Sequence, residues 1–161
     1  MTTPTNVALS TLIASHLASI DSTLTDDHLI VLAHLVGSTN LIVDALHLID
    51  TQGVARLNLP NRQSLYQVSG STKAYTVHTT PSAASIGRLG FCPCPAFAYS
   101  VLKTQQNVLA SQAPHILLGC KHLLAVLICE RLDTFVDKQV GLKWLAAWSS
   151  GFRTLQQVPP T

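Results

Sequence analysis

Apolar residues recur at helical spacing through residues 1–50 of the chain. A spacing of three and four places such residues on one face of a helix, so three amphipathic helices are predicted. Gly37 and Gly53 mark helix ends, and Thr25 and Thr39 are suitable N-cap residues. Residues 1–52 are therefore predicted to form an N-terminal helical region. The three apolar faces comprise Leu9, Leu12, Ile13, Leu17 and Ile20, then Leu29, Leu32, Ala33 and Val36, and then Ile42, Ala45, Leu46 and Ile49.

Between Val54 and His78, apolar residues recur at every second position in place of the helical spacing. Short apolar runs alternate with polar residues here and are separated by turn sequences at residues 60–62 and 69–71, a pattern typical of strands joined by tight turns. We predict a small antiparallel β-meander at the start of a second region, residues 53–133. The alternating apolar residues are Ala55, Leu57 and Leu59, then Tyr66 and Val68, and then Tyr75 and Val77.

Beyond the meander the pattern becomes irregular and then helical again. Residues 79–90 and 104–119 are predicted loops, with a helix from Pro95 to about Lys103 between them. The apolar run from Leu123 to Ile128 predicts a long helix. The expected fold class is α+β, with all parts in one compact domain.

Residues 134–161 are predicted to form a C-terminal helix and a tail. Val136, Val140, Trp144 and Trp148 recur at intervals of four residues, and Gly151 would end the helix. Two interpretations of this stripe stay open. It could pack against the protein's own core, or Trp144 and Trp148 could contact a partner, because tryptophan is enriched at binding hot spots.

Two close pairs of potential metal ligands lie in the middle of the chain. Cys92 and Cys94 flank one proline, and Cys120 and His122 flank one lysine after an interval of 25 residues. Zinc prefers four tetrahedral thiolate and imidazole ligands, and ligands paired in sequence require only two segments to meet. The second pair can reach one ion if Cys120 precedes the first turn of a helix and His122 lies within it. The spacing therefore predicts a zinc site.

Other interpretations of these cysteines have to be weighed. The thiols could be ordinary core residues, since free cysteine is among the most buried residue types. Disulfides are not expected, because residues 1–55 contain no Lys or Arg and so no secretory leader with a basic start. Cys129 and His115 are nearby candidate ligands. However, Cys129 would lie about 10 Å beyond His122 along a helix axis, and His115 is not part of the CxH pair.

At these residues the chain resembles the SWIM zinc-finger family. The extended form CxC…CxHxxA, which includes Ala125, is similar to the SWIM proteins of Shu complexes, although the loop at 104–119 is longer than the usual form of that family. The likeness covers about residues 44–132. The stretches that carry it are Leu65–Val68, Ser71–Thr76, Cys94–Leu102 and Cys120–Val126.

The resemblance implies a structural zinc ion and a role in DNA repair. A protein of this family pairs with a RecA-like recombinase paralogue and promotes recombinase filament assembly in homologous recombination, in the nucleus. Ala125, one turn after His122, would then either contact the partner or pack inside the chain. The alternative is a free-standing SWIM finger that binds DNA or protein in another nuclear role.

Composition and charge favour an assembly subunit. Charged residues make up 11% of the chain, against about 25% in typical soluble domains, and hydrophobic residues 47%, which predicts a large core or an apolar surface for a partner. Residues 1–55 hold five Asp and no Lys or Arg, for a charge of −5. The other residues hold ten basic and three acidic side chains, for +7. The basic part is compatible with DNA contact, directly or through the partner.

Catalysis and membrane insertion are not expected. Four protein ligands close a tetrahedral zinc shell and leave no position for substrate. Gly70–Lys73 lacks the Gly-Lys-Ser/Thr ending of a nucleotide-binding P-loop, so a partner would have to bind ATP. The apolar run from Leu123 to Cys129 is far shorter than a membrane span.

Overall fold

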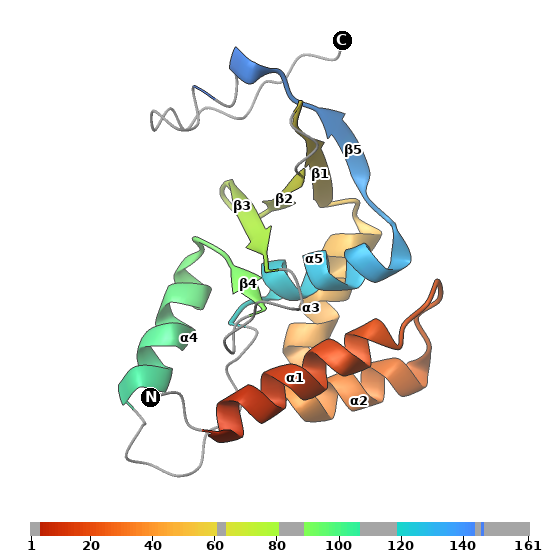
Figure 1. Cartoon of the computed structure of the whole chain (residues 1–161), viewed down its shortest axis with the longest axis vertical. Coiled ribbons are helices and arrows are strands. Elements are labelled where there is room, and N and C mark those ends of the chain that lie inside the picture. The colour runs from red at the N-terminus through yellow and green to blue at the C-terminus, as the bar shows by residue number, and fades with distance from the viewer. Residues whose placement is uncertain (1–3, 61–63, 81–88, 107–118, 144–145, 147–161) are drawn as a thin grey trace.

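A computed structural model describes residues 4–60, 64–80, 89–106, 119–143 and 146 (Figure 1). It contains helices and a mixed five-stranded sheet, so the predicted α+β class is confirmed. No helix in these ranges is both long and apolar enough to cross a lipid bilayer. In chain order the elements are α1 Pro4–Ala18, α2 Asp26–Val36, α3 Thr39–Asp50, β1 Val54–Asn58, β2 Ser64–Ser69, β3 Ala74–Thr79, β4 Gly90–Phe91, α4 Pro95–Gln106, α5 Lys121–Leu132 and β5 Val136–Gln139.

The first three helices follow the apolar periodicity. Thr25 caps α2 by accepting a hydrogen bond from the backbone N–H of His28, and the Thr25 N–H donates in return to Nδ1 of His28. Gly37 ends α2 in the left-handed region at φ 71°, where its N–H donates to the carbonyl of Ala33. The buried apolar residues of these helices are Ile13, Leu17, Ile20, Leu32, Val36, Ile42 and Ala45.

The boundaries of α3 differ from the prediction at both ends. Ser38, and not Thr39, is the N-cap, since its extended backbone lets its side chain accept the N–H of Leu41. At the other end Thr51 is the C-cap, and Gln52 takes the positive φ of 55°. Gly53 lies beyond the helix, and its N–H donates to Leu48. The sequence offered adjacent residues of equal cap propensity, and the backbone conformation distinguishes them.

The strands form one sheet in the order β4-β3-β2-β1-β5. The predicted antiparallel meander is confirmed in β1, β2 and β3, with registers such as Val54↔Val68 and Tyr66↔Val77. The sheet also has a short antiparallel strand, β4, at one edge and a parallel strand, β5, at the other. Neither edge strand was predicted.

The predicted C-terminal helix beginning at Val136 is wrong. Val136–Gln139 is strand β5, which pairs in parallel with Ala55–Asn58 of β1. An interval of four is even and so fits the period of two of a strand as well as a helix. Val136 in the strand is exposed, and Val140 just beyond it is buried. Trp144, Trp148 and Gly151 lie outside the described residues.

Ion pairs at the sheet edge hold β5 in place. The guanidinium of Arg56 in β1 pairs with Asp137 of β5 at 2.7 Å and with Asp133 at 3.0 Å. Asp133 ends α5 in the left-handed region at φ 50°. Arg56 therefore contacts both the residue that ends α5 and a residue of β5, in addition to the backbone pairing of β5 with β1.

Helix α5 lies between the sheet and the N-terminal helices (Figure 1) and contacts both β3 and α3. Every residue from His122 to Cys129 is buried. The main core runs from Ile13 to Cys129, and a smaller cluster contains Leu57, Leu59 and Val140. Residues on either side of the predicted boundary at 52 and 53 therefore share one core.

Candidate metal centre

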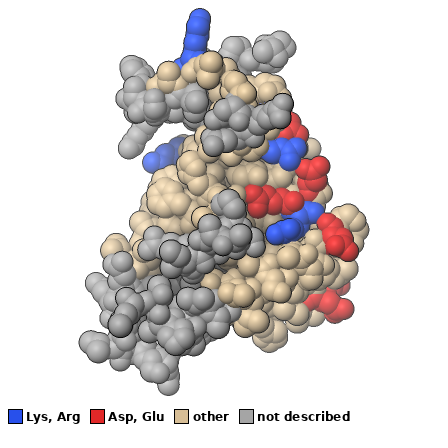
Figure 2. Space-filling model, in the orientation of Figure 1, with Lys and Arg blue, Asp and Glu red and all other residues tan. Residues whose placement is uncertain are grey.

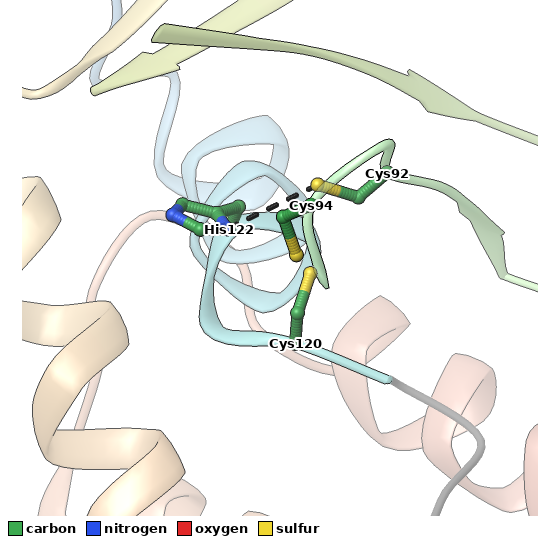
Figure 3. A group of neighbouring side chains, drawn as sticks. All are labelled: Cys92, Cys94, Cys120 and His122. Carbon is green, nitrogen blue, oxygen red and sulfur yellow. Dashed lines mark hydrogen bonds between the residues drawn. The ribbon is translucent and has the colours of Figure 1, made fainter. Parts of the chain in front are cut away.

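Four potential ligand side chains, from Cys92, Cys94, Cys120 and His122, converge between β4 and α5 (Figure 3). One ligand atom from each lies within 4.8 Å of the others, and all four residues are buried. This is the one cluster of its kind among the residues that the structure describes. The two sequence pairs therefore meet in space as the spacing predicted.

The first pair is positioned by strand β4. Its Phe91 pairs with His78 and its Gly90 with Thr79, so Cys92 follows directly from the sheet edge. A Cβ at position 90 would collide with the carbonyl oxygen of His78 and lie 2.7 Å from Cδ1 of Leu123. Glycine at this position lets β4 approach β3 and α5 closely.

Cys94 is held at the start of α4. Its Sγ accepts a hydrogen bond from the backbone N–H of Phe97 at 3.3 Å, and its carbonyl accepts the N–H of Ala98. The helix continues to Gln106 and so includes residues 104–106, which were predicted as loop.

Cys120 is the N-cap of α5, and His122 lies in its first turn, as predicted. The Sγ of Cys120 accepts the backbone N–H of Leu123 at 3.5 Å. The preceding Gly119 has φ 68°, and a Cβ there would lie 2.5 Å from the ring of Phe97. Glycine therefore allows the chain to enter α5 beside α4.

The three thiols influence one another's pKa. A hydrogen bond with Cys92, with further help from His122 and the N–H of Leu123, lowers the pKa of Cys120. The same bond, together with burial, raises the pKa of Cys92, and burial raises the pKa of Cys94. Ionisation of one of these thiols therefore affects the others, and a metal cation would favour the thiolate form that binds it.

His122 directs one ring nitrogen toward the thiols. Its Nδ1 lies 3.9 Å from Sγ of Cys92, which the dashed line in Figure 3 marks. Its Nε2 is buried without a hydrogen-bond partner among the described residues. The Tyr75 ring packs against the imidazole with centroids 4.9 Å apart, and the ammonium of Lys73 lies 5.5 Å from the centroid of that ring.

The donor set fits a structural zinc ion. Bond lengths of about 2.3 Å to sulfur and 2.0 Å to nitrogen place tetrahedral ligand atoms about 3.5 to 3.8 Å apart, close to the spacing found here. Backbone N–H groups already donate to the sulfurs of Cys94 and Cys120, an arrangement that supports thiolate ligands. Three thiolates and one neutral imidazole would fill the shell.

The other candidate residues have different surroundings. Cys129 is fully buried outside the cluster, and burial raises the pKa of its thiol to about 11. His115 lies outside the described residues. Ala125 has no exposed surface, which favours the alternative that it packs inside the chain. In this conformation it cannot contact a partner directly.

Curated proteins provide close comparisons. The chain is 34% identical over 121 residues to zinc finger SWIM domain-containing protein 7 of Homo sapiens, a match that covers 74% of this chain and 72% of that protein. The protein of the same name from Danio rerio is 32% identical over 117 residues, covering 72% and 69%. The Mus musculus protein is 32% identical over 121 residues, covering 74% and 66%. No protein-family model and no solved structure matches the chain.

Proposed function

The chain belongs to the family of zinc finger SWIM domain-containing protein 7, and from this premise we propose that it is a zinc-binding subunit of a Shu-type complex. In this proposal it pairs with a RecA-like recombinase paralogue in the nucleus. The pair promotes assembly of the recombinase filament during homologous recombination repair.

The buried Cys3His cluster is the observation that carries this proposal. Zinc bound by Cys92, Cys94, Cys120 and His122 would tie the segment between β4 and α4 to the start of α5. Its chemistry there is structural, because four protein ligands leave no open position for water or substrate. The protein would then act by holding a binding surface in shape, without catalysis.

The surface supports a role in assembly. Several large apolar side chains are exposed, and in Figure 2 most of the described surface in view is tan, with the acidic side chains toward one side. Exposed apolar surface with few charges is typical of protein contact sites. In this proposal the RecA-like partner binds the nucleotide, since Gly70–Lys73 lacks the ending of a P-loop. The exposed residues include Phe91, Tyr99 and Leu102 near the metal centre and Leu12, Ile30, Val31 and Val43 in the N-terminal helices.

Purification of the tagged full-length chain from its native cells tests the proposal. We expect one zinc per chain by elemental analysis and a RecA-like protein in the same size-exclusion peak, identified by mass spectrometry. The matched control is His122→Ala, which should lose both. A soluble zinc-loaded monomer with salt-sensitive affinity for DNA would instead support the free-standing finger.

A further inference from the structure

The helices α1 and α2 form an antiparallel hairpin on the outside of the molecule (Figure 1). His16 of α1 and His28 of α2 meet across it, with ring centroids 5.7 Å apart. Nε2 of His16 also lies 3.0 Å from the backbone carbonyl oxygen of His28. These contacts fix which turns of the two helices face each other.

Two exposed apolar residues lie beside this contact, and a third, Ile30, follows on the solvent side of α2. Leu12 is one turn before His16 in α1, and Val31 is three residues after His28 in α2. Because the helices are antiparallel, both steps run in the same direction along the hairpin and place these side chains near each other. Leu12 is 55% exposed, Val31 40% and the adjacent Ile30 56%. We call Leu12, Ile30 and Val31 the hairpin patch.

The charged side chains that the hairpin itself carries beside the patch are acidic. Asp26 and Asp27 are exposed and lie one turn before Ile30 and Val31 in α2. No Lys or Arg occurs in residues 1–55. Figure 2 shows acidic side chains at the end of the hairpin where α2 begins. The patch is therefore an apolar surface with a negative edge.

We propose that the hairpin patch docks a basic amphipathic segment of a partner protein. Apolar side chains of that segment would cover the patch, and its Lys or Arg would face Asp26 and Asp27. The same negative edge repels nucleic-acid phosphates and anionic lipid headgroups, which argues against both as occupants. The proposal rests on the proposed function in assigning the segment to the RecA-like partner.

Site-specific cross-linking in the purified complex tests this directly. Photoreactive benzoylphenylalanine would replace Leu12 or Val31, with Val43 of α3, 58% exposed, as the control position. We expect positions 12 and 31 to link to one partner segment that has Lys or Arg beside large apolar residues. Links to an acidic segment, to a second copy of this chain, to nucleic acid or to lipid would overturn the proposal, as would linkage only at position 43.

Binding measurements give a second test. Ile30→Ser should weaken partner binding at least about tenfold, as loss of a hot-spot side chain does, whereas Val43→Ser should not. Asp26→Asn combined with Asp27→Asn should slow association and flatten its salt dependence. Circular dichroism checks that α2 remains folded, since acidic residues in its first turn also favour the helix dipole.

The outcomes separate this inference from the proposed function. If all variants keep zinc and bind a RecA-like partner equally well, the hairpin patch is not the docking surface and the proposed function stands. If the patch cross-links to a basic segment of a protein unrelated to RecA, the docking surface stands and the proposed function is wrong.

Discussion

The two halves of the protein are stabilised by different means. The helical half, residues 4–50, buries apolar side chains with Ser10 as its one buried polar residue among those described. The metal half, from β1 onward, buries four potential ligands in a single cluster. Helix α5 of the metal half packs against both the helical half and the sheet. A lost ligand and a lost apolar side chain should therefore have different consequences.

The largest effect is expected from His122→Ala. The variant should lose stoichiometric zinc and unfold the metal half, because the free energy of structural zinc binding, about 10 kcal/mol or more at neutral pH, contributes directly to folding. Elemental analysis and circular dichroism measure both. Cys129→Ala in the same helix is the matched control and should keep its zinc. A folded His122→Ala protein with one zinc per chain would refute the ligand assignment.

A cavity in the helical half should lower stability without loss of metal. Ile42 of α3 is 4% exposed in the shared core, so Ile42→Ala should reduce the free energy of unfolding by about 2 to 5 kcal/mol. Urea titration measures this, with the exposed Val43→Ala as the near-neutral control. The folded fraction should still contain one zinc per chain. Parallel loss of zinc would show that the two halves are not separable in this way.

A smaller effect is expected from Tyr75→Ala, which removes the ring packed on His122. Groups that orient a ligand commonly affect metal affinity tenfold or more, so zinc should transfer to a colorimetric chelator about ten times faster. Tyr75→Phe keeps the ring and should behave as the parent. Tyr66→Ala, which removes a ring stacked on Phe135 instead, is the control. Zinc release at equal rates from Tyr75→Ala and Tyr66→Ala would contradict a specific role of Tyr75 in orienting His122.

The smallest effect concerns Cys129. With a buried thiol whose pKa is raised to about 11, it should not react with iodoacetamide at about pH 8 in the zinc-loaded protein. Chelation should expose Cys92, Cys94 and Cys120 first, because they depend on the metal. Mass spectrometry of the alkylated peptides measures the order. Early labelling of Cys129 would mean that α5 opens before the metal centre does.

Much of this arrangement could be predicted from local pattern. The apolar periodicity located α1, α2 and α3, and the alternation located β1, β2 and β3. The ligand spacing brought the four side chains together, and the need for Cys120 and His122 to reach one point placed Cys120 at the start of α5. The helices and the meander are set by residues close in sequence, and the metal cluster by two ligand pairs that are each close in sequence.

The edge strands could not be predicted because distant contacts determine them. Strand β4 has only two residues, too few to show a hydrophobic periodicity. It forms because it pairs with β3 and because Gly90 has no side chain that would collide with β3 or α5. Strand β5, Val136–Gln139, has a single apolar residue, and its conformation depends on pairing with β1 and on the contact with Arg56. Burial of Ala125 likewise depends on elements packed on both sides of α5.

The pairing of β1 with β5 has a consequence for newly made chains. Arg56 and Asp137 are 81 residues apart in sequence. The outer edge of β1 is therefore covered only after nearly the whole metal half has been synthesised. Strand β5 directly follows α5, which begins at the ligand pair Cys120 and His122. A chain made under zinc limitation would therefore leave β1 as an open edge strand, and open edges template aggregation. We expect zinc supply during synthesis to determine the soluble yield of this protein.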